Sequence, residues 1–499
     1  MHAIARHSIV NLIAFALSRM IGLIVVTLVV GEYGLAAFGL IMLVRLFLPG
    51  QLFMIFDLAL PEVVTRATAQ GLALDQATEA ARLYLAAQIL AIGIGTVLAL
   101  PLMLAPEAIT HLLFNLDATD AAELAPAVIA HGAALPLLFA ANVAGAGLKG
   151  QEAFHDLRMV EVVTALLYGL AALLLVRVDA SVTAIAIAYL CSRVLRAMAA
   201  LFLGRRGFGR QAWRGVRPDF RLLFADKAYH RALIARRFGA TATGQLPRLL
   251  ISYLLGPAAV GLFEAVLRLP RFLKAVVALC HVGVMPVVVR LNLAGRKDEL
   301  TKIALHGPRL LMSIASLAVL PTACLSQPLL AVWLGPEVEP YWPWFAALCV
   351  LPLLSATIGF WSAMGKVDAG FVRKQNRVAL VQGLLMAAVA LPLFGTLGAA
   401  AFWLGAICSI ICVAPALMAI NAKRFEVPAV RLALPLLWVV LASLPAAAVG
   451  VALQHWLPLD NWPRLLAAFA LVSAVQAAML ACFIVRPEER RTLLRLGRS

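Results

Sequence analysis

Positive side chains occur inside segments of this chain that are otherwise apolar enough to span a bilayer. They are Arg19, Arg45, Arg193, Arg248, Arg268, Arg271 and Lys274. A cation at mid-membrane costs at least ~2.5–3.5 kcal/mol on insertion scales, so such residues usually face a watery cavity, a partner or a ligand. Asp57 and Glu264 are the only acids that the sequence places clearly inside the same segments. Because ion pairs between helices need balanced charges, the excess of cations indicates binding of an anion.

Four of the charged residues share one face of a predicted helix. They are Glu264, Arg268, Arg271 and Lys274. At about 100° per residue they fall within roughly 120° of arc on a helical wheel. Arginine forks hold phosphate oxygens bidentately, so this face predicts a grip on a phosphate or diphosphate. The alternative is a Glu264–Arg268 pair, with the other cations extended towards the membrane surface.

The remaining cations come from other spans. Arg19 and Arg248 lie halfway along their segments, Arg45 lies in the outer half of its segment, and Arg193 lies in a segment that also holds Arg196. We expect Arg19, Arg45, Arg193 and Arg248 to bind the same anion as the face at 264–274. Pairing between helices is the alternative, with Asp57 as the main available acid.

The elements that must position these side chains are membrane helices. The chain is 63% hydrophobic and 13% charged, which excludes an ordinary soluble domain. Apolar runs of about 20 residues recur along it, as a bilayer core requires of spanning helices. The spacing predicts fourteen spans in an all-α multi-pass membrane protein, at 9–30, 38–60, 81–104, 125–147, 159–177, 182–203, 239–255, 259–289, 303–330, 343–364, 378–394, 398–420, 432–454 and 464–485.

Charge is distributed by side of the membrane. Of the 42 Lys and Arg residues, 31 lie in segments predicted to be cytoplasmic, and these segments alternate with loops that hold almost no Lys or Arg, such as the acidic loop 105–124. This is the positive-inside pattern, which predicts an even number of spans with both termini in the cytoplasm. It also argues against nucleic acid as a partner.

The chain repeats itself across its longest basic segment. Residues 34–40 read G-x-A-A-F-G-L and residues 256–262 read G-x-A-A-V-G-L. Both copies have the same orientation, which predicts a parallel repeat about an axis along the membrane normal. We therefore expect an N-terminal six-helix lobe (1–203), a basic cytoplasmic linker (204–237), a C-terminal six-helix lobe (238–420), and two further helices with a basic tail (421–499).

Several stretches resemble one transporter family. They are QLPRLLISYLLGPAAVGLFEAVLRLPRFL (245–273), SRMIGLIVVTLVVGEYGLAAFGL (18–40), the helix exit at 286–290 and the segment 329–366. They are similar to O-antigen-type polysaccharide-export flippases of the multidrug/oligosaccharidyl-lipid/polysaccharide (MOP) exporter superfamily. Many members carry Asp where this chain has Arg248, which argues against cation coupling at that position.

The resemblance implies a function and partners. We expect two six-helix lobes related by a pseudo-twofold axis, and a cationic central cavity that works by alternating access. The expected substrate is a polyprenyl-diphosphate-linked oligosaccharide. It would move from the cytoplasmic to the outer leaflet of the bacterial inner membrane, for O-antigen or exopolysaccharide biosynthesis. Membrane lipids and glycan polymerase or export enzymes are the expected partners.

The carboxylates Asp57 and Glu264 have two interpretations. Each is either a structural counter-charge or a site for a coupling ion, Na⁺ or H⁺. Apart from such an ion we expect no cofactor, no metal site and no catalytic residue, because no P-loop, zinc-ligand or nucleophile–base spacing is present.

Alternative functions stay open from the residues alone. A peptidoglycan lipid-precursor flippase would also need a cationic cavity. A MATE-like cation-coupled drug exporter is disfavoured, because a cationic cavity repels cationic drugs. A membrane glycan polymerase or ligase is more remote. Such an enzyme generally needs a sizeable external loop to hold an acceptor and catalytic groups, and the largest external loop here is the short segment 105–124. We therefore expect a transporter and not an enzyme.

Overall fold

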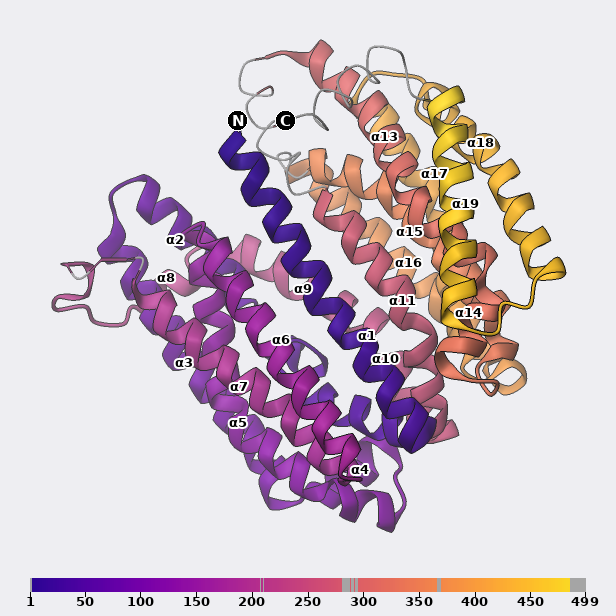
Figure 1. Ribbon diagram of the computed structural model, residues 1–499. Helices are drawn as coiled ribbons and strands as arrows, with labels where there is room; N and C mark the ends of the chain where they lie inside the picture. Colours follow the sequence, from indigo (N-terminus) through magenta and orange to yellow (C-terminus); the bar gives the residue numbers. More distant parts are fainter. Residues whose placement is uncertain are drawn as a thin grey trace. The chain divides into compact units, whose positions relative to one another are not determined.

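The computed structural model describes residues 2–206, 208–209, 211–280, 288, 291, 295–365 and 369–484 (Figure 1). These ranges contain helices, turns and loops but no β-strand, so the predicted all-helical fold is confirmed. The chain divides into two compact units, Met1–Glu264 and Ala265–Ser499. The predicted tail after residue 484 and most of the helix exit at 286–290 lie outside the described residues. The predicted lobe and linker boundaries stay predictions.

The first unit is a bundle of long helices joined by short ones. Its elements are α1 (His2–Val44), η1 (Arg45–Phe47), η2 (Leu52–Ile55), α2 (Leu60–Ala73), α3 (Ala77–Leu104), α4 (Pro106–Phe114), α5 (Ala118–Gly150), α6 (Phe154–Arg177), α7 (Val182–Arg206), η3 (Gln211–Trp213), α8 (Phe220–Leu223), α9 (Lys227–Gly244), α10 (Leu246–Leu255) and the first turns of α11 (Pro257–Cys280). Within the unit, α5 packs against α3 and α7, and α6 packs against α1 and α7. These contacts set the relative positions of the charged side chains on α1, α6 and α7.

The second unit contains the rest of α11 and the later helices. Its elements are α13 (Lys297–Cys324), α14 (Ser326–Leu334), η4 (Glu339–Tyr341), α15 (Trp342–Gly365), α16 (Ala369–Leu397), α17 (Ala400–Arg424), α18 (Ala429–Trp456) and α19 (Trp462–Phe483). Its core includes Trp361, which is 1% exposed and donates its indole N–H to the Ala304 carbonyl at 2.8 Å. A buried indole needs such a partner, and this bond ties α15 to α13.

Eleven helical segments in the described residues are long and apolar enough to cross a membrane. They cover twelve of the predicted spans, because Ala16–Ile55 combines the first two. The predicted spans 239–255 and 259–289 are not among them. The first is divided between α9 and α10, and α11 carries four charged residues. The chain is thus a multi-pass membrane protein, and the count of fourteen stays a prediction.

The predicted second span is not one continuous helix. The α-helix ends at Val44, and two short 3₁₀ turns precede α2. Pro49 and Gly50 lie in this break, and neither residue favours a helix interior. Leu58 and Ala59 then adopt positive φ angles of 52° and 55°, a conformation that costs L-residues of order 1–3 kcal/mol each. Broken helices of this kind occur in transporters beside substrate and ion sites.

The two repeat heptads have matching backbone conformations and contact each other. Gly34 has φ 78° and ψ −179°, and Gly256 has φ 82° and ψ 179°. A Cβ placed on Gly39 would overlap the Pro257 carbonyl oxygen, and one on Gly261 would overlap the Leu35 carbonyl oxygen. The contacts are reciprocal at the offset of the sequence repeat, as a local twofold axis requires. The glycines are therefore needed for the close approach of two backbones.

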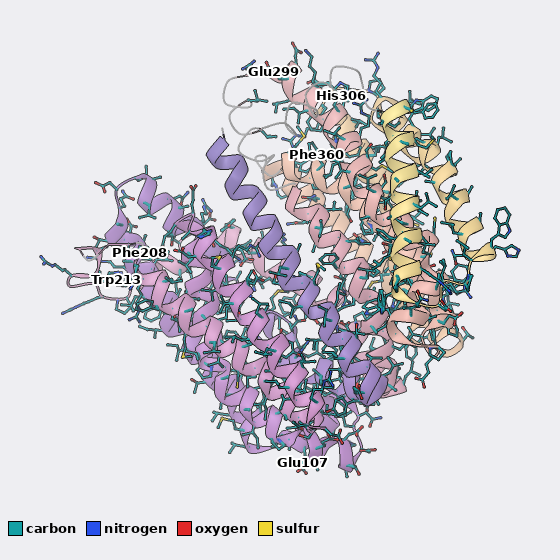
Figure 2. The ribbon with its side chains drawn as sticks, in the orientation of Figure 1. Glu107, Phe208, Trp213, Glu299, His306 and Phe360 are labelled. Carbon is teal, nitrogen blue, oxygen red and sulfur yellow. The ribbon has the colours of Figure 1, made fainter. Side chains whose placement is uncertain are left out.

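Aromatic rings fix the start of the basic linker on the first unit. Phe208 is 4% exposed, and its ring lies 5.3 Å from that of Tyr84 and 5.6 Å from that of Trp213. The Trp213 indole donates to the Arg205 carbonyl at 3.1 Å. Figure 2 shows Phe208 and Trp213 at the opposite end of this unit from Glu107. Residue 107 of the acidic loop and the start of the linker therefore lie at opposite ends of the first unit, and their placement on the two sides of the membrane stays a prediction.

Candidate functional site

The helices α6 and α7 present a polar seam to each other. The Tyr168 and Tyr189 rings lie 5.1 Å apart, and Glu161 lies 3.4 Å from Arg196. Along each helix these contacts are about two turns apart, which is the register of an antiparallel pair. On α7, Tyr189, Arg193 and Arg196 follow i, i+4, i+7 spacing and share one face. A predicted site residue, Arg193, thus lies on the same face of α7 as Tyr189 and Arg196 and interacts electrostatically with Arg196.

Arg45 lies at the tyrosine end of this seam. Its guanidinium carbon lies 3.7 Å from the centroid of the Tyr189 ring, and Nη2 donates to the Tyr168 hydroxyl at 2.6 Å. The Arg45 Nε is buried and has no hydrogen-bond partner among the described residues. The contacts that hold Arg45 are therefore neutral ones, which stabilise its position without removing its charge.

Glu161 lies at the other end of the seam among several cations, here named the Glu161 cluster. Its carboxylate accepts from Arg158 at 2.6 Å and from Arg196 at 3.4 Å. Arg19 and Lys149 interact with it electrostatically, and Arg193 with Arg196. The members of the cluster are Arg19, Lys149, Arg158, Glu161, Arg193 and Arg196. Cations from α1, α5, α6 and α7 thus converge on one carboxylate, and the cluster carries a net positive charge.

Arg248 is bound by a bidentate ion pair. Its Nε lies 2.7 Å from Glu264 Oε1 and its Nη2 lies 3.3 Å from Glu264 Oε2. Its Nη1 donates to the side-chain carbonyls of Gln51, at 3.0 Å, and Gln245. The Glu264 side chain is 1% exposed and that of Arg248 is 13% exposed. The structure therefore brings two predicted site residues together across α10 and α11, as a buried pair.

Asp57 has a partner that sequence reasoning did not assign. Arg237 of α9 binds Asp57 through Nη1 and Glu62 through Nη2. The Ala59 N–H also donates to Asp57 Oδ1 at 2.9 Å, which supports the strained turn into α2. Arg237 therefore ties α9 to the break in the second predicted span.

A second ion pair extends this attachment outside the membrane spans. Asp226 caps α9, where its Oδ1 accepts from the Tyr229 N–H at 3.0 Å, and its Oδ2 lies 3.2 Å from Arg66 Nη1. The backbone N–H of Tyr229, followed by Arg66, holds the pKa of Asp226 below its ordinary value. Both charges are exposed, so this pair adds little to the stability that Arg237 supplies.

Arg237→Met is expected to lower the stability of the folded protein by about 3–5 kcal/mol, because it leaves the buried Asp57 carboxylate without its cation. Thermal unfolding of the purified protein in detergent measures the loss. Arg66→Met is the matched control, because it removes the exposed pair to the same helix, and its effect should stay within about 1 kcal/mol. Equal effects of the two substitutions would contradict a buried role for Arg237.

The other predicted cations, Arg268, Arg271 and Lys274, lie along α11 beyond Glu264. Arg268 and Arg271 are half-buried, and Arg271 acts electrostatically on Lys274. The helix continues through Pro270, so these residues keep the one-face spacing that the sequence predicts. They lie in the second unit, whereas the other predicted site residues lie in the first.

Sequence reasoning missed part of the site. It named Asp57 and Glu264 as the only acids clearly inside spans and gave no role to Glu161, which lies near the start of the candidate span His155–Arg177. It also placed Lys149 and Arg158 in a cytoplasmic segment. The i, i+3 spacing of Arg158 and Glu161 was the signal that could have identified the pair. No local pattern links Glu161 to Arg196, which lies on another helix.

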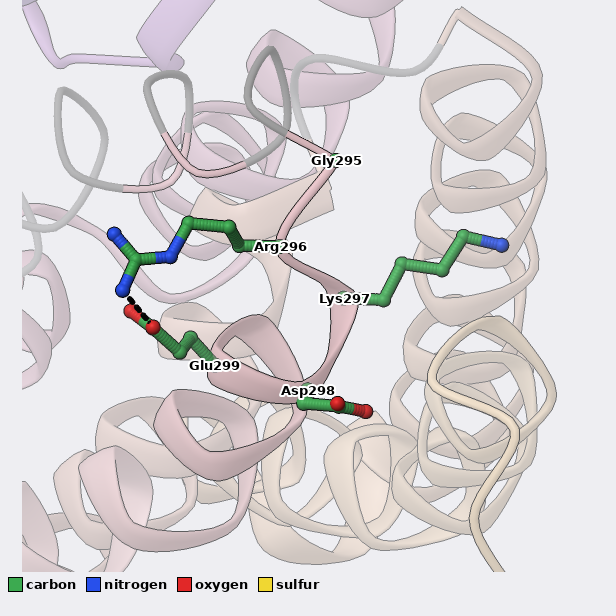
Figure 3. Close-up of a pocket in the computed structure, with 5 residues that line it drawn as sticks. All are labelled: Gly295, Arg296, Lys297, Asp298 and Glu299. Atoms are coloured by element: carbon green, nitrogen blue, oxygen red, sulfur yellow. Dashed lines mark hydrogen bonds and ion pairs between the residues drawn. The ribbon is translucent and has the colours of Figure 1, made fainter.

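A small pocket occurs at the start of α13, and it is unconnected with these residues. It is lined by the consecutive residues 295–299, where Arg296 pairs with Glu299 (Figure 3). Both side chains are exposed, so this is an ordinary solvated turn. Within the described ranges, no group of three or more His, Cys, Asp or Glu residues could hold a metal ion.

Comparisons with known proteins agree on the family and the fold. A family model described as "Polysaccharide biosynthesis protein" matches residues 4–292, which is more than half of the chain. No protein of curated function matches the sequence. The solved structure of the lipid II flippase MurJ, in an inward closed conformation, is similar with a TM-score of 0.70 and 11% identity, over 96% of this chain and 100% of that one.

Two transporters of the MOP superfamily share the fold at lower similarity. An inward-facing multidrug resistance MATE family transporter has a TM-score of 0.62 and 14% identity, over 83% of this chain and 94% of its own. A MOP superfamily transporter from Pyrococcus furiosus, for which a reversed polarity of the binding pocket suggests a different function, has a TM-score of 0.54 and 17% identity, over 84% of this chain and 95% of its own. The chain therefore belongs to the polysaccharide biosynthesis protein family and has the membrane-transporter fold of the MOP superfamily.

Proposed function

We propose that the protein flips a polyprenyl-diphosphate-linked oligosaccharide from the cytoplasmic to the outer leaflet of the bacterial inner membrane. The observation that carries this proposal is the convergence of cations on the single carboxylate Glu161 inside a lobe of membrane helices. A diphosphate headgroup supplies the negative charge that such a cluster attracts, and arginine forks bind its oxygens bidentately. Membership of a polysaccharide biosynthesis family favours a glycan as the attached group.

The proposed binding residues have different roles. Arg19 and Arg193 belong to the Glu161 cluster and bind phosphate oxygens, and Arg45 offers a further charge beside Tyr168 and Tyr189. Because Arg248 is already bound to Glu264, its contribution is to hold that buried carboxylate and to add positive field. We further propose that Arg268, Arg271 and Lys274 of α11 bind the same class of anion.

Transport needs no covalent chemistry. Binding energy that differs between two conformations is sufficient to shift their populations, which is the basis of alternating access. Asp57 and Glu264 each bind an arginine, so we propose that both are counter-charges. Na⁺ or H⁺ coupling through either carboxylate is the alternative. The proposal includes no other cofactor, places both termini in the cytoplasm, and gives membrane lipids and glycan polymerase or export enzymes as partners.

A peptidoglycan lipid-precursor flippase is the second candidate function. The fold similarity to the lipid II flippase MurJ, with a TM-score of 0.70, is the observation that favours it. That substrate would use the same cationic chemistry, so the two candidates differ in the glycan. A MATE-like drug exporter is less favoured, because the Glu161 cluster would repel a cationic drug, and a glycan polymerase or ligase is remote.

Reconstitution in liposomes separates these functions. The probes are a fluorescent polyprenyl-diphosphate oligosaccharide, a lipid II-type precursor and a cationic dye, each tested with and without Na⁺ and H⁺ gradients. The proposal expects movement of the first probe, at rates above those of the other two. Preferential movement of the precursor would support the second candidate, and movement of the dye alone would contradict a lipid-diphosphate flippase.

A further inference from the structure

Glu161 holds the arginines of the Glu161 cluster in the way that a phosphate would hold them. One carboxylate oxygen accepts from Arg158 at 2.6 Å and the other lies 3.4 Å from Arg196. The pair joins α6 to α7, and the Glu161 side chain is 14% exposed. The two arginine side chains are 28% and 27% exposed, so neither is fully enclosed by the protein.

The charges around Glu161 exceed what it can neutralise alone. Arg19 and Lys149 act on it from α1 and α5, and Arg193 lies within electrostatic reach of Arg196. The Arg193 Nε is buried and has no hydrogen-bond partner among the described residues. Glu62, a second acid that acts on Lys149, is already bound by Arg237. The cluster therefore carries more positive charge than the Glu161 carboxylate balances, and this excess favours the approach of an anion.

We infer that Glu161 is a positioning residue that occupies the place of a substrate phosphate in the empty protein. It binds Arg158 and Arg196, and these arginines exchange the carboxylate for a phosphate when a diphosphate binds. This inference rests on the proposed function. In the empty protein, Glu161 keeps the two guanidinium groups aligned between α6 and α7. When the phosphate takes over these bonds, the carboxylate becomes a nearby like charge that weakens binding. Glu161 thereby prevents the phosphate from binding so tightly that it is not released.

Pyrophosphate binding to the full-length protein in detergent tests the inference. The variant is Glu161→Gln, which keeps the size of the side chain, removes its charge and leaves one acceptor oxygen where the carboxylate has two. Its affinity for inorganic pyrophosphate is expected to rise by about tenfold, equivalent to about 1.4 kcal/mol. Asp156→Asn is the matched control, because Asp156 is an exposed carboxylate on the same helix. Its affinity should change by less than about twofold, because exposed charges are screened.

Flipping of the diphosphate-linked oligosaccharide in liposomes supplies a second readout. Glu161→Gln should bind the substrate more tightly and move it more slowly at saturation, because release becomes limiting, whereas a merely structural role would weaken binding. Thermal unfolding confirms that the variant is folded. If it is not, Glu161→Asp replaces it, and a smaller rise in pyrophosphate affinity is expected, because the shorter carboxylate holds Arg158 and Arg196 less closely.

The outcomes distinguish the inference from the function on which it rests. Tighter pyrophosphate binding with slower flipping supports both. Unchanged or weaker binding by folded Glu161→Gln, while the wild-type protein binds and flips, overturns the inference alone. Absence of both pyrophosphate binding and flipping in the wild-type protein overturns the proposed function and the inference with it.

Discussion

Arg248→Met is expected to destabilise the folded protein by about 3–5 kcal/mol, because it removes the arginine that binds both oxygens of the buried Glu264 carboxylate. The Glu264 side chain is 1% exposed and receives two of the Arg248 donors, at 2.7 and 3.3 Å. Water does not replace these two donors at such a buried site, so the desolvation of the Glu264 carboxylate is no longer offset by its bonds to Arg248. Thermal unfolding of the purified protein in detergent measures this loss.

Two further variants make the result specific. Replacing both partners, in Arg248→Met/Glu264→Leu, should recover most of the lost stability, because the variant no longer buries a carboxylate that has lost its bidentate arginine. Arg464→Met removes an exposed i, i+4 pair to Asp460 at 2.9 Å, and its effect should be at most about 1 kcal/mol. If the double variant were no more stable than Arg248→Met, the buried-pair explanation would be wrong.

Gly39→Ala should destabilise the protein by about 1–3 kcal/mol or more, because the added methyl overlaps backbone that has no rotamer with which to move aside. Its Cβ would overlap the Pro257 carbonyl oxygen and lie 3.0 Å from the Gly261 amide nitrogen. Gly261→Ala should cost a similar amount, since its Cβ meets Leu35 and Gly39 in the reciprocal way. Combining the two substitutions should cost less than their sum, because either one already separates the heptads.

Gly31→Ala is the control for the glycine prediction. It lies in α1 on the other side of the non-helical residue Gly34, and a Cβ there meets nothing within 4 Å. This change should leave stability unchanged or raise it by up to about 1 kcal/mol, as alanine does in helix interiors. A loss at Gly31 equal to that at Gly39 would show that the effect belongs to the helix and not to the contact.

Much of this architecture could be predicted from the sequence, because hydropathy and glycine act locally. The apolar runs predict the helical membrane fold, and the heptads at 34–40 and 256–262 predict a repeat whose glycines share one backbone conformation. The break after Val44 was not predicted, although Pro49 and Gly50 were its signal. An apolar run does not distinguish one span from a span with a turn inside it.

The pairing of charges could not be predicted, because it depends on which helices pack together. Arg248 with Glu264, Asp57 with Arg237 and Glu161 with Arg196 each join separate helices or turns. A helical wheel relates residues within one helix only, so it could place Arg268 near Glu264 but could not identify Arg248 as a partner.

The most direct test of the proposed function is flipping of a polyprenyl-diphosphate oligosaccharide in liposomes by the wild-type protein and by Arg193→Gln/Arg196→Gln. Loss of two charge-assisted contacts, each worth about 1.5–3 kcal/mol, should slow flipping at least ~10-fold, while thermal unfolding shows an intact fold. Arg177→Gln is the control, because Arg177 is exposed at the far end of α6. It should flip at the wild-type rate. Flipping at full rate by the folded double variant would contradict the assignment of the Glu161 cluster as the site that recognises the diphosphate.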